Sequence, residues 1–122
     1  MSDNDPAIEV RPSKRHKRGV FARRTFAAGD VIERCPVIVV PPGQRERLDL
    51  TSLYDYYFGW EGGAAALALG FGSLYNHSAD PLARYEKNVP AETVVIVAAR
   101  DIAAGEEITV SYGRPWFEPV VD

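Results

Sequence analysis

The chain has 122 residues, 46% hydrophobic and 25% charged, which is the make-up of one globular domain and too short for two independent cores. Cys35 is its single cysteine, so an internal disulfide and a zinc site built on cysteine clusters are both excluded. Its ordinary role is that of a small apolar strand residue. His16 and His77 show no metal-ligand spacing, and we expect no metal site.

No apolar run reaches the roughly 18–20 residues that span a membrane. The first ten residues lack both the basic start and the apolar stretch of a signal peptide. We therefore expect an intracellular protein without membrane contact, cytoplasmic if its source is bacterial.

The net charge of −3 is unevenly distributed along the chain. Residues 11–24 hold seven basic side chains and no acidic one, which leaves seven basic and seventeen acidic residues elsewhere, a balance of 7 − 17 = −10. Basic blocks often bind nucleic acid or act as targeting signals, but here we favour a solvated strand-and-turn segment. No helix-turn-helix or base-stacking motif accompanies the block, so direct nucleic-acid binding is not predicted. The acidic remainder would attract a basic partner.

Residues 1–7 are typical of a flexible N-terminus, and short strands are expected over 8–10 and 19–22. Two similar units follow, at 22–32 and 99–108. Each has a hydrophobic residue, two alanines, a glycine suited to positive φ, an acid and a β-branched residue. This pattern predicts two tight turns that lead into strands.

Residues 31–40 are rich in strand-forming types, and Pro36 indicates an edge or a bulge there. After a Pro-Pro-Gly break, Thr51 or Ser52 could cap a short helix that ends at Gly62-Gly63. Residues 64–69 fit either helix or strand.

Glycines at both ends of the stretch 70–72 indicate close backbone approach. Residues 93–99 predict a buried strand. Residues 107–112 alternate, with Ile108, Val110 and Tyr112 on one face. Many short strands, many turns and little helix together predict a mainly β domain without an internal linker.

Three segments carry the chemistry: Arg-Gly-Val-Phe-Ala at 18–22, Gly-Phe-Gly-Ser-Leu-Tyr-Asn-His-Ser-Ala-Asp-Pro at 70–81, and Ile-Ala-Ala-Gly-Glu-Glu-Ile-Thr-Val-Ser-Tyr-Gly at 102–113. Each is weak alone, and Asn76-His77-Ser78 has the composition of a polar turn. A nucleophilic pair of Ser78 and His77 is disfavoured, because adjacent side chains point apart and no nucleophile elbow surrounds the serine.

In this order and spacing the segments resemble the SET-domain family of protein-lysine methyltransferases, over residues 8–117, with 118–122 left as a tail. The absence of cysteine clusters makes the chain similar to the compact, zinc-free SET proteins of large DNA viruses and bacteria. The resemblance implies a mainly β fold with several small curved sheets, short helices and a C-terminal pseudoknot. It also implies a homodimer.

S-adenosylmethionine is the cofactor that the resemblance implies. The backbone of Lys17, Arg18 and Gly19 would wrap its methionine part, Asn76 would hydrogen-bond its amino end, and the backbone of His77 would contact the adenine edge.

The resemblance also implies an aromatic site for the methyl group and the lysine. Tyr112 would be the catalytic tyrosine, and Tyr56, Tyr112 and Trp116 would line the channel for the substrate lysine. Phe117 would cover the adenine. The substrate would be a basic protein, such as a histone, a histone-like bacterial protein or a ribosomal protein.

Three positions depart from the family pattern. Lys17 replaces the first glycine of a Gly-x-Gly turn, at a cost of about 1–2 kcal/mol if that position needs positive φ. Trp116 replaces a tyrosine or phenylalanine, and Leu82 replaces an asparagine. Because of Lys17 and Trp116, a SET-fold module that binds a basic peptide with little or no catalysis stays open as an alternative.

Overall fold

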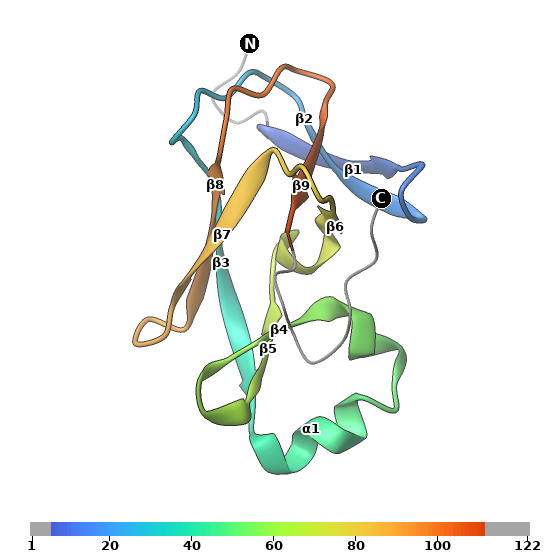
Figure 1. Ribbon diagram of the computed structural model, residues 1–122, viewed down its shortest axis with the longest axis vertical. Helices are drawn as coiled ribbons and strands as arrows, with labels where there is room; N and C mark the ends of the chain where they lie inside the picture. The colour runs from blue at the N-terminus through green and yellow to red at the C-terminus, as the bar shows by residue number, and fades with distance from the viewer. Residues whose placement is uncertain (1–5, 112–122) are drawn as a thin grey trace.

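The computed structural model describes residues 6–111, which form two small twisted sheets joined by short turns (Figure 1). One sheet has the strand order β1-β2-β9-β6 and the other β4-β5-β3-β8-β7. The expectation of a mainly β fold with small curved sheets and short helices is confirmed. The expected pseudoknot and C-terminal tail lie outside the described residues.

The four-stranded sheet begins with a hairpin of β1 (Ile8–Pro12) and β2 (Arg18–Ala22), so both strands expected here are confirmed. β9 (Glu107–Val110) pairs antiparallel with β2 and parallel with the two-residue strand β6 (Asn76–His77). Alternation turns Val20 and Ile108 into the core, where both are fully buried. Gly19, Glu107 and Asn76 share the opposite face.

The two similar turn units lie side by side and hydrogen-bond to each other. Phe26 and Ile102 form a reciprocal backbone pair at 2.9 and 2.8 Å. The glycines that the pattern predicted, Gly29 and Gly105, both have φ of +92°. The Gly29 amide donates to the Ala98 carbonyl at the end of β8 (Thr93–Ala98), and the Gly105 amide donates to the Ala22 carbonyl at the end of β2, both at 2.8 Å. Each turn is thus bonded to the strand that precedes the other unit. Both turns are thus confirmed.

Strand β3 (Val31–Val40) is the long central strand of the second sheet. Its first half pairs with β8 (Thr93–Ala98) and its second half with β5 (Ala65–Ala68), and Pro36 lies at the changeover. The expected edge strand is wrong, because β3 lies in the centre of the sheet. The expected bulge at Pro36 is also wrong, because the register shift falls between Val31 and Glu33. A residue without an N–H is tolerated where the hydrogen-bonding partner changes.

The outer strands of this sheet are β4 (Tyr57–Gly59) and β7 (Ala83–Asn88). Residues 64–69, which fitted helix or strand, form β5. The expected helix from Thr51 to Gly62-Gly63 is wrong in extent. Thr51 does cap a helix, accepting the Leu53 amide at 3.2 Å, but that helix is the single turn η1 (Ser52–Tyr56). Pairing of the following aromatic residues with β5 overrides the helical continuation.

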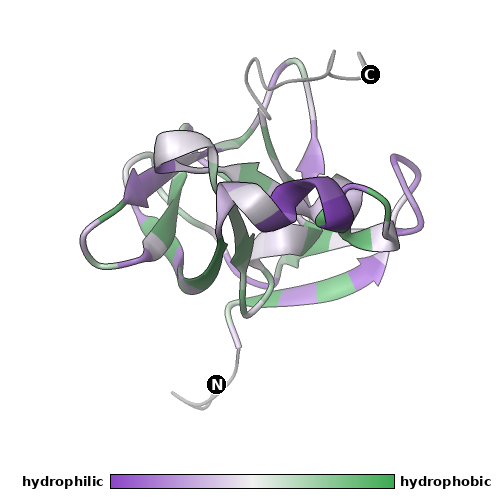
Figure 2. Cartoon of the chain, turned by 90° about the horizontal axis from the view of Figure 1, so that it is seen from below, coloured by the Kyte–Doolittle hydropathy of each residue, from purple (hydrophilic) through white to green (hydrophobic). Residues whose placement is uncertain are grey.

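Two further helical segments were not expected as such. Helix α1 (Pro42–Leu48) starts directly after β3 with a proline in its first turn, and η2 (Glu61–Gly63) contains both glycines of the expected helix end. Figure 2 shows hydrophilic residues along α1, which buries none of its side chains. No helix in the described part of the chain is long and apolar enough to cross a membrane.

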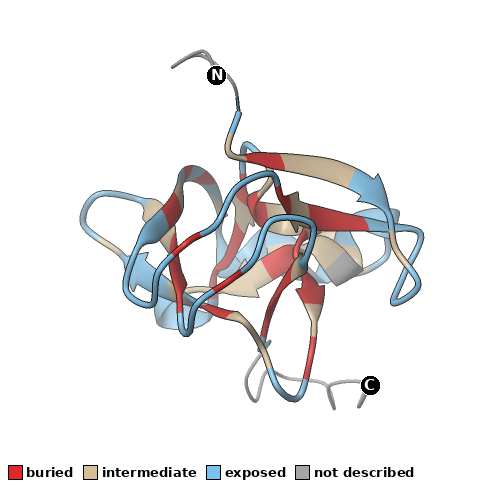
Figure 3. Cartoon of the chain, turned by 90° about the horizontal axis from the view of Figure 1, so that it is seen from above, coloured by how far each residue is buried: buried red, intermediate tan, exposed pale blue. Residues whose placement is uncertain are grey.

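The core lies between the two sheets and is built from their strands, with exposed residues gathered at the turns (Figure 3). Gly72, at the start of η3 (Gly72–Leu74), is packed so tightly that a Cβ atom would lie 2.6 Å from Ala68 Cβ and 2.9 Å from Cys35 Sγ. The expected close backbone approach is therefore confirmed. It lets η3 lead directly from the core into β6.

Candidate cofactor and active site

Asn76 is the centre of a buried polar cluster on the face of the four-stranded sheet opposite Val20 and Ile108. Its parallel pairing with Thr109 of β9 places it beside the end of β2. Its side chain is 7% exposed, and its Nδ2 atom donates to the Arg18 carbonyl at 2.9 Å and to Glu107 Oε2 at 2.8 Å. Ser13 Oγ lies 3.3 Å from the same nitrogen.

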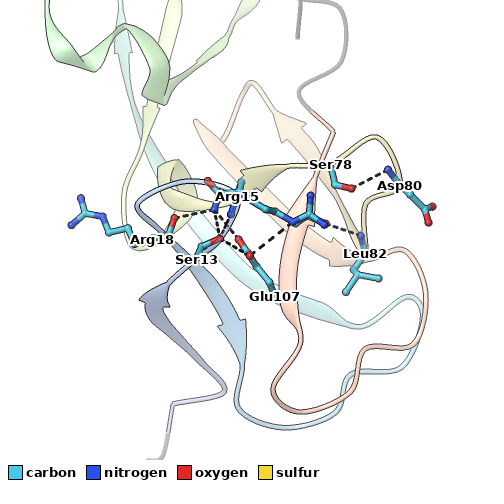
Figure 4. A network of polar contacts seen from close by, with 9 residues as sticks. Ser13, Arg15, Arg18, Ser78, Asp80, Leu82 and Glu107 are labelled. Atoms are coloured by element: carbon cyan, nitrogen blue, oxygen red, sulfur yellow. Dashed lines mark hydrogen bonds and ion pairs between the residues drawn. The ribbon is translucent and has the colours of Figure 1, made fainter. Parts of the chain in front are cut away.

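Glu107 connects this cluster to the loop between β1 and β2. The Ser13 hydroxyl donates to Glu107 Oε1 at 2.7 Å and accepts the Arg15 amide at 3.0 Å (Figure 4). Arg15 Nε lies 3.9 Å from the same carboxylate oxygen. The loop is thereby fastened over the sheet beside Asn76.

Gly19 is required here by lack of space rather than by its backbone angle. A Cβ atom on it would lie 2.2 Å from Glu107 Oε2 and 2.8 Å from Asn76 Nδ2. Neither Gly19 nor Lys17 has positive φ, since Glu92 is the one non-glycine residue with positive φ in the described chain. The backbone cost considered for Lys17 therefore does not arise, and the residue is exposed.

His77 and Ser78 continue the chain past Asn76. His77 pairs with Val110 on β6, and the Ser78 amide donates to the Val110 carbonyl at 3.1 Å. The Ser78 hydroxyl is buried and accepts the Asp80 amide at 3.0 Å, which makes it part of a turn. This agrees with the sequence argument against a serine nucleophile.

Leu82, at the position of the family's asparagine, packs against the hydrophobic core. Its amide donates to Thr109 Oγ1 at 3.3 Å, so its backbone joins the turn after Asn76 to strand β9 (Figure 4). The leucine thus extends the core without disturbing the polar cluster.

The structure brings Arg18, Gly19 and Asn76 together, with Lys17 and His77 next to them in the chain. Tyr56 comes from a separate segment, the last residue of η1, and is partly buried. The remaining predicted site residues, Tyr112, Trp116 and Phe117, lie outside the described residues.

A second polar anchor holds η3, the segment that leads into Asn76. Glu33 on β3 accepts the Phe71 amide at 3.0 Å and the Tyr75 hydroxyl at 2.8 Å. Burial and the neighbouring Glu33 carboxylate raise the pKa of Tyr75. Burial likewise raises the pKa of the Cys35 thiol to about 12, so this cysteine is a packing residue and not a nucleophile.

Sequence reasoning missed Ser13, Glu107 and Glu33. A signal for Glu107 was present, because alternation that turns Ile108 and Val110 inward turns Glu107 and Thr109 to the face that carries Gly19. No comparable pattern marked Ser13 or Glu33, whose partners are distant in sequence. The described residues contain no cluster of His, Cys, Asp and Glu that could hold a metal ion.

Comparison with known proteins identifies the family. The SET domain family model matches residues 17–113. The chain is 34% identical over 113 residues to a Schizosaccharomyces pombe protein described as a histone-lysine N-methyltransferase specific for H3 lysine-37, covering 91% of this chain and 77% of that protein. It is 30% identical over 105 residues to the histone-lysine N-methyltransferase set9 of Aspergillus terreus, covering 84% of this chain and 16% of that protein.

A solved Plasmodium falciparum structure assigned as a histone methyltransferase superposes with a TM-score of 0.77 at 30% identity, covering 93% of this chain and 99% of that one. The chain belongs to the SET domain family. The predicted class, a protein-lysine methyltransferase, is confirmed by these comparisons. These relatives come from two fungi and a parasite, so the zinc-free viral and bacterial subgroup stays a prediction, as do the domain limits at 8 and 117.

Proposed function

We propose that the chain transfers a methyl group from S-adenosylmethionine to the ε-amino group of a lysine on a basic protein, a histone or a histone-like protein. The observation that carries this proposal is the buried Asn76 amide, held between the Arg18 carbonyl and the Glu107 carboxylate in a SET-domain chain. The relatives described as histone-lysine methyltransferases and the acidic remainder of the chain support the histone-like substrate.

The cluster has the chemistry to hold the cationic amino end of that cofactor. The Asn76 amide nitrogen donates its hydrogen bonds to acceptors of the protein, and no group of the described chain donates to the Oδ1 atom of Asn76. That oxygen and the second lone pair of the Arg18 carbonyl are acceptors for an ammonium group. The nearby Glu107 carboxylate favours a positive charge.

When bound, S-adenosylmethionine supplies a methyl group activated by a positively charged sulfur, so that one N–C bond forms as one C–S bond breaks. The part of this chain is to hold the geometry, and positioning can supply about 7–11 kcal/mol of the barrier. In the proposal Tyr112 and nearby carbonyls hold the methyl group through C–H···O contacts, each worth about 0.5–1 kcal/mol.

The substrate lysine must be neutral to attack, and its proton passes to solvent. Model lysine has a pKa of about 10.4. A channel lined by Tyr56, Tyr112 and Trp116 would lower this pKa by desolvation, while cation–π attraction to the same rings opposes the shift. Phe117 would close the adenine side.

Transfer from methyl-labelled cofactor to core histones and to a peptide containing lysine 37 of histone H3 tests the proposal. Wild type should label lysine, and Tyr112→Phe should lose most of that activity. Tyr85→Phe, the same change on strand β7, is the matched control and should keep it. If the wild type binds cofactor and basic peptides but labels no lysine across a broad peptide set, the chain is instead a peptide-binding SET module.

We also propose a homodimer. Ile38 on β3 and Leu69 in the turn directly after β5 support it, because both are large apolar residues left 52% and 44% exposed. Sedimentation equilibrium should give twice the chain mass, reduced to one chain mass by Ile38→Glu with Leu69→Glu. A wild type that sediments as a single chain at every concentration would contradict the dimer.

A further inference from the structure

We propose that Glu107 is a positioning residue for cofactor binding: it fixes the orientation of the Asn76 amide and fastens the loop between β1 and β2 beside it. The inference deepens the proposed function and rests on it, because the ligand concerned is the amino-acid end of S-adenosylmethionine. Glu107 lies on the strand before Tyr112, and its carboxylate side chain is 13% exposed.

The orientation of the Asn76 amide follows from the chemistry of its neighbours. The Arg18 carbonyl at 2.9 Å and the Glu107 carboxylate at 2.8 Å can only accept hydrogen bonds. The amide group facing them must therefore be the NH₂, which leaves Oδ1 directed to the other side. An ammonium group is a pure donor, so an amide turned the other way would present N–H groups to N–H groups.

The second contribution of Glu107 is to the loop. Its Oε1 atom accepts the Ser13 hydroxyl at 2.7 Å, and Ser13 in turn accepts the Arg15 amide at 3.0 Å. One carboxylate thus uses one oxygen to hold the loop and the other to hold Asn76 (Figure 4). Glutamate can accept hydrogen bonds on both of its side-chain oxygens, whereas glutamine, which has the same length, has only one oxygen to accept with.

Replacing Glu107 should leave the core intact, which makes the proposal testable. Strand β9 is anchored by Ile108 and Val110 on the opposite face, where both are at most 1% exposed. Gly19 leaves room for the Glu107 carboxylate, and a glutamine of the same size fits the same space. Glu107→Gln keeps one acceptor oxygen and turns the other into an NH₂ group.

Calorimetric binding of S-adenosylhomocysteine, which retains the amino-acid end, is the primary measurement. Glu107→Gln should raise its Kd about tenfold, the effect of one lost charge-assisted hydrogen bond. Glu106→Gln is the matched control: this neighbouring carboxylate is exposed, and its Oε1 accepts the Ala103 amide at 2.8 Å, which a glutamine can still do. The control should leave the Kd unchanged.

Binding of 5′-methylthioadenosine, which lacks the amino-acid end, separates positioning from general damage. Its Kd should be the same for wild type and Glu107→Gln. In an Asn76→Ala background, Glu107→Gln should have a smaller effect on S-adenosylhomocysteine, because only the contribution through the loop remains. Ser13→Ala, a change in a surface loop, should weaken binding in the same direction and provides the test if Glu107→Gln does not fold by circular dichroism.

An unchanged Kd for S-adenosylhomocysteine in Glu107→Gln or in its Ser13→Ala substitute would overturn the inference and leave the proposed function standing. So would an equal loss for 5′-methylthioadenosine, or a full effect in the Asn76→Ala background. A wild type that binds neither compound would overturn the inference together with the proposed function.

Discussion

At the scale of single residues, the site depends on glycine at position 19, which has no Cβ atom. Gly19 lies where the carboxylate of Glu107 and the amide of Asn76 reach across from two other strands. Glycine in a Gly-rich turn is usually explained by positive φ, but Gly19 does not have it. Its role is to leave room for two polar side chains.

Gly19→Ala should therefore displace both side chains and abolish measurable cofactor binding, with a loss of about 1–3 kcal/mol in unfolding free energy from overpacking. Gly43→Ala is the matched control, since nothing lies within 4 Å of a Cβ atom there, in helix α1. That change should keep binding and stabilise by about 0.4–1 kcal/mol. Equal binding by the two variants in calorimetry would contradict the steric role of Gly19.

Cys35 gives a prediction from its pKa. The thiol is fully buried, and burial together with Glu33 raises its pKa from 9.0 to about 12. Because the pKa in the folded state is above the unfolded value, this group's contribution to stability is present below pH 9 and is lost as the pH rises toward 12. Near pH 8 the fraction of Cys35 that is present as thiolate in the native protein is about 1,000-fold lower than for an exposed cysteine.

Native protein at pH 8 should consequently react with a thiol reagent only as fast as it unfolds, and addition of denaturant should release the full reaction. Stopped-flow labelling measures both rates. Rapid labelling of the native protein at the rate of a free thiol would show that Cys35 is not in the packed position against Gly72.

The sequence could predict Asn76 and Gly19 as site residues because they belong to short local motifs. It could not predict the hydrogen bonds of Glu107, since its partners lie 94 and 31 positions away and meet it only when β2, β9 and β6 assemble. The free-energy cost expected at Lys17 assumed a positive φ at this position. The φ angle is set by the hairpin as a whole, and it is not positive.

At the scale of elements, the segment between β3 and β5 is the part of the fold least evident from sequence. Its short helices bury little, and the last two residues of the aromatic run, Tyr57 and Phe58, pair with β5 instead of extending η1. By contrast, the paired turns at Gly29 and Gly105 were predicted because glycine and an acidic cap occur at the same spacing in both.

Arg45 links helix α1 to two other parts of this segment, β4 and η2. Its Nη1 atom donates to the Gly63 carbonyl at 2.8 Å, its Nε atom donates to Tyr57 Oη at 3.3 Å, and its guanidinium lies 5.2 Å from the Tyr57 ring centroid. Tyr57 also donates to Asp49. The arginine therefore fixes α1 against the residue next to Tyr56.

Arg45→Ala should lower the unfolding free energy by about 1–2 kcal/mol through these lost contacts. It should also raise the KM for a peptide substrate more than the Kd for cofactor, because the segment carries Tyr56 and not Asn76. Arg47→Ala, an exposed arginine on the same helix, is the control and should change neither. Equal effects of the two changes on denaturant unfolding and on KM would contradict this role for Arg45.

At the scale of the whole molecule, charge is separated along the chain. All seven basic residues of 11–24 are exposed, while the other residues carry a net charge of −10. Composition gave this separation directly, and the strand-and-turn interpretation of the basic block agrees with its place in the β1–β2 hairpin and the turn that follows. The architecture of two sheets sharing one core required the long-range pairing of β3 with both β5 and β8.

The acidic surface should speed the encounter with a basic substrate, so kcat/KM for a histone peptide should fall several-fold as salt rises from about 50 mM to about 500 mM. The Kd for cofactor, which depends on buried contacts, should change much less. Steady-state kinetics and calorimetry across the same salt series measure the two. A kcat/KM that is independent of salt would contradict electrostatic attraction of the substrate.

Methyl transfer from S-adenosylmethionine to lysine is tested most directly by mass spectrometry of core histones incubated with the chain and cofactor, with wild type compared with Asn76→Ala. We expect added methylene masses that map to lysine side chains with wild type and are absent with Asn76→Ala. Methylation of another residue type, or equal methylation by both proteins, would contradict this expectation.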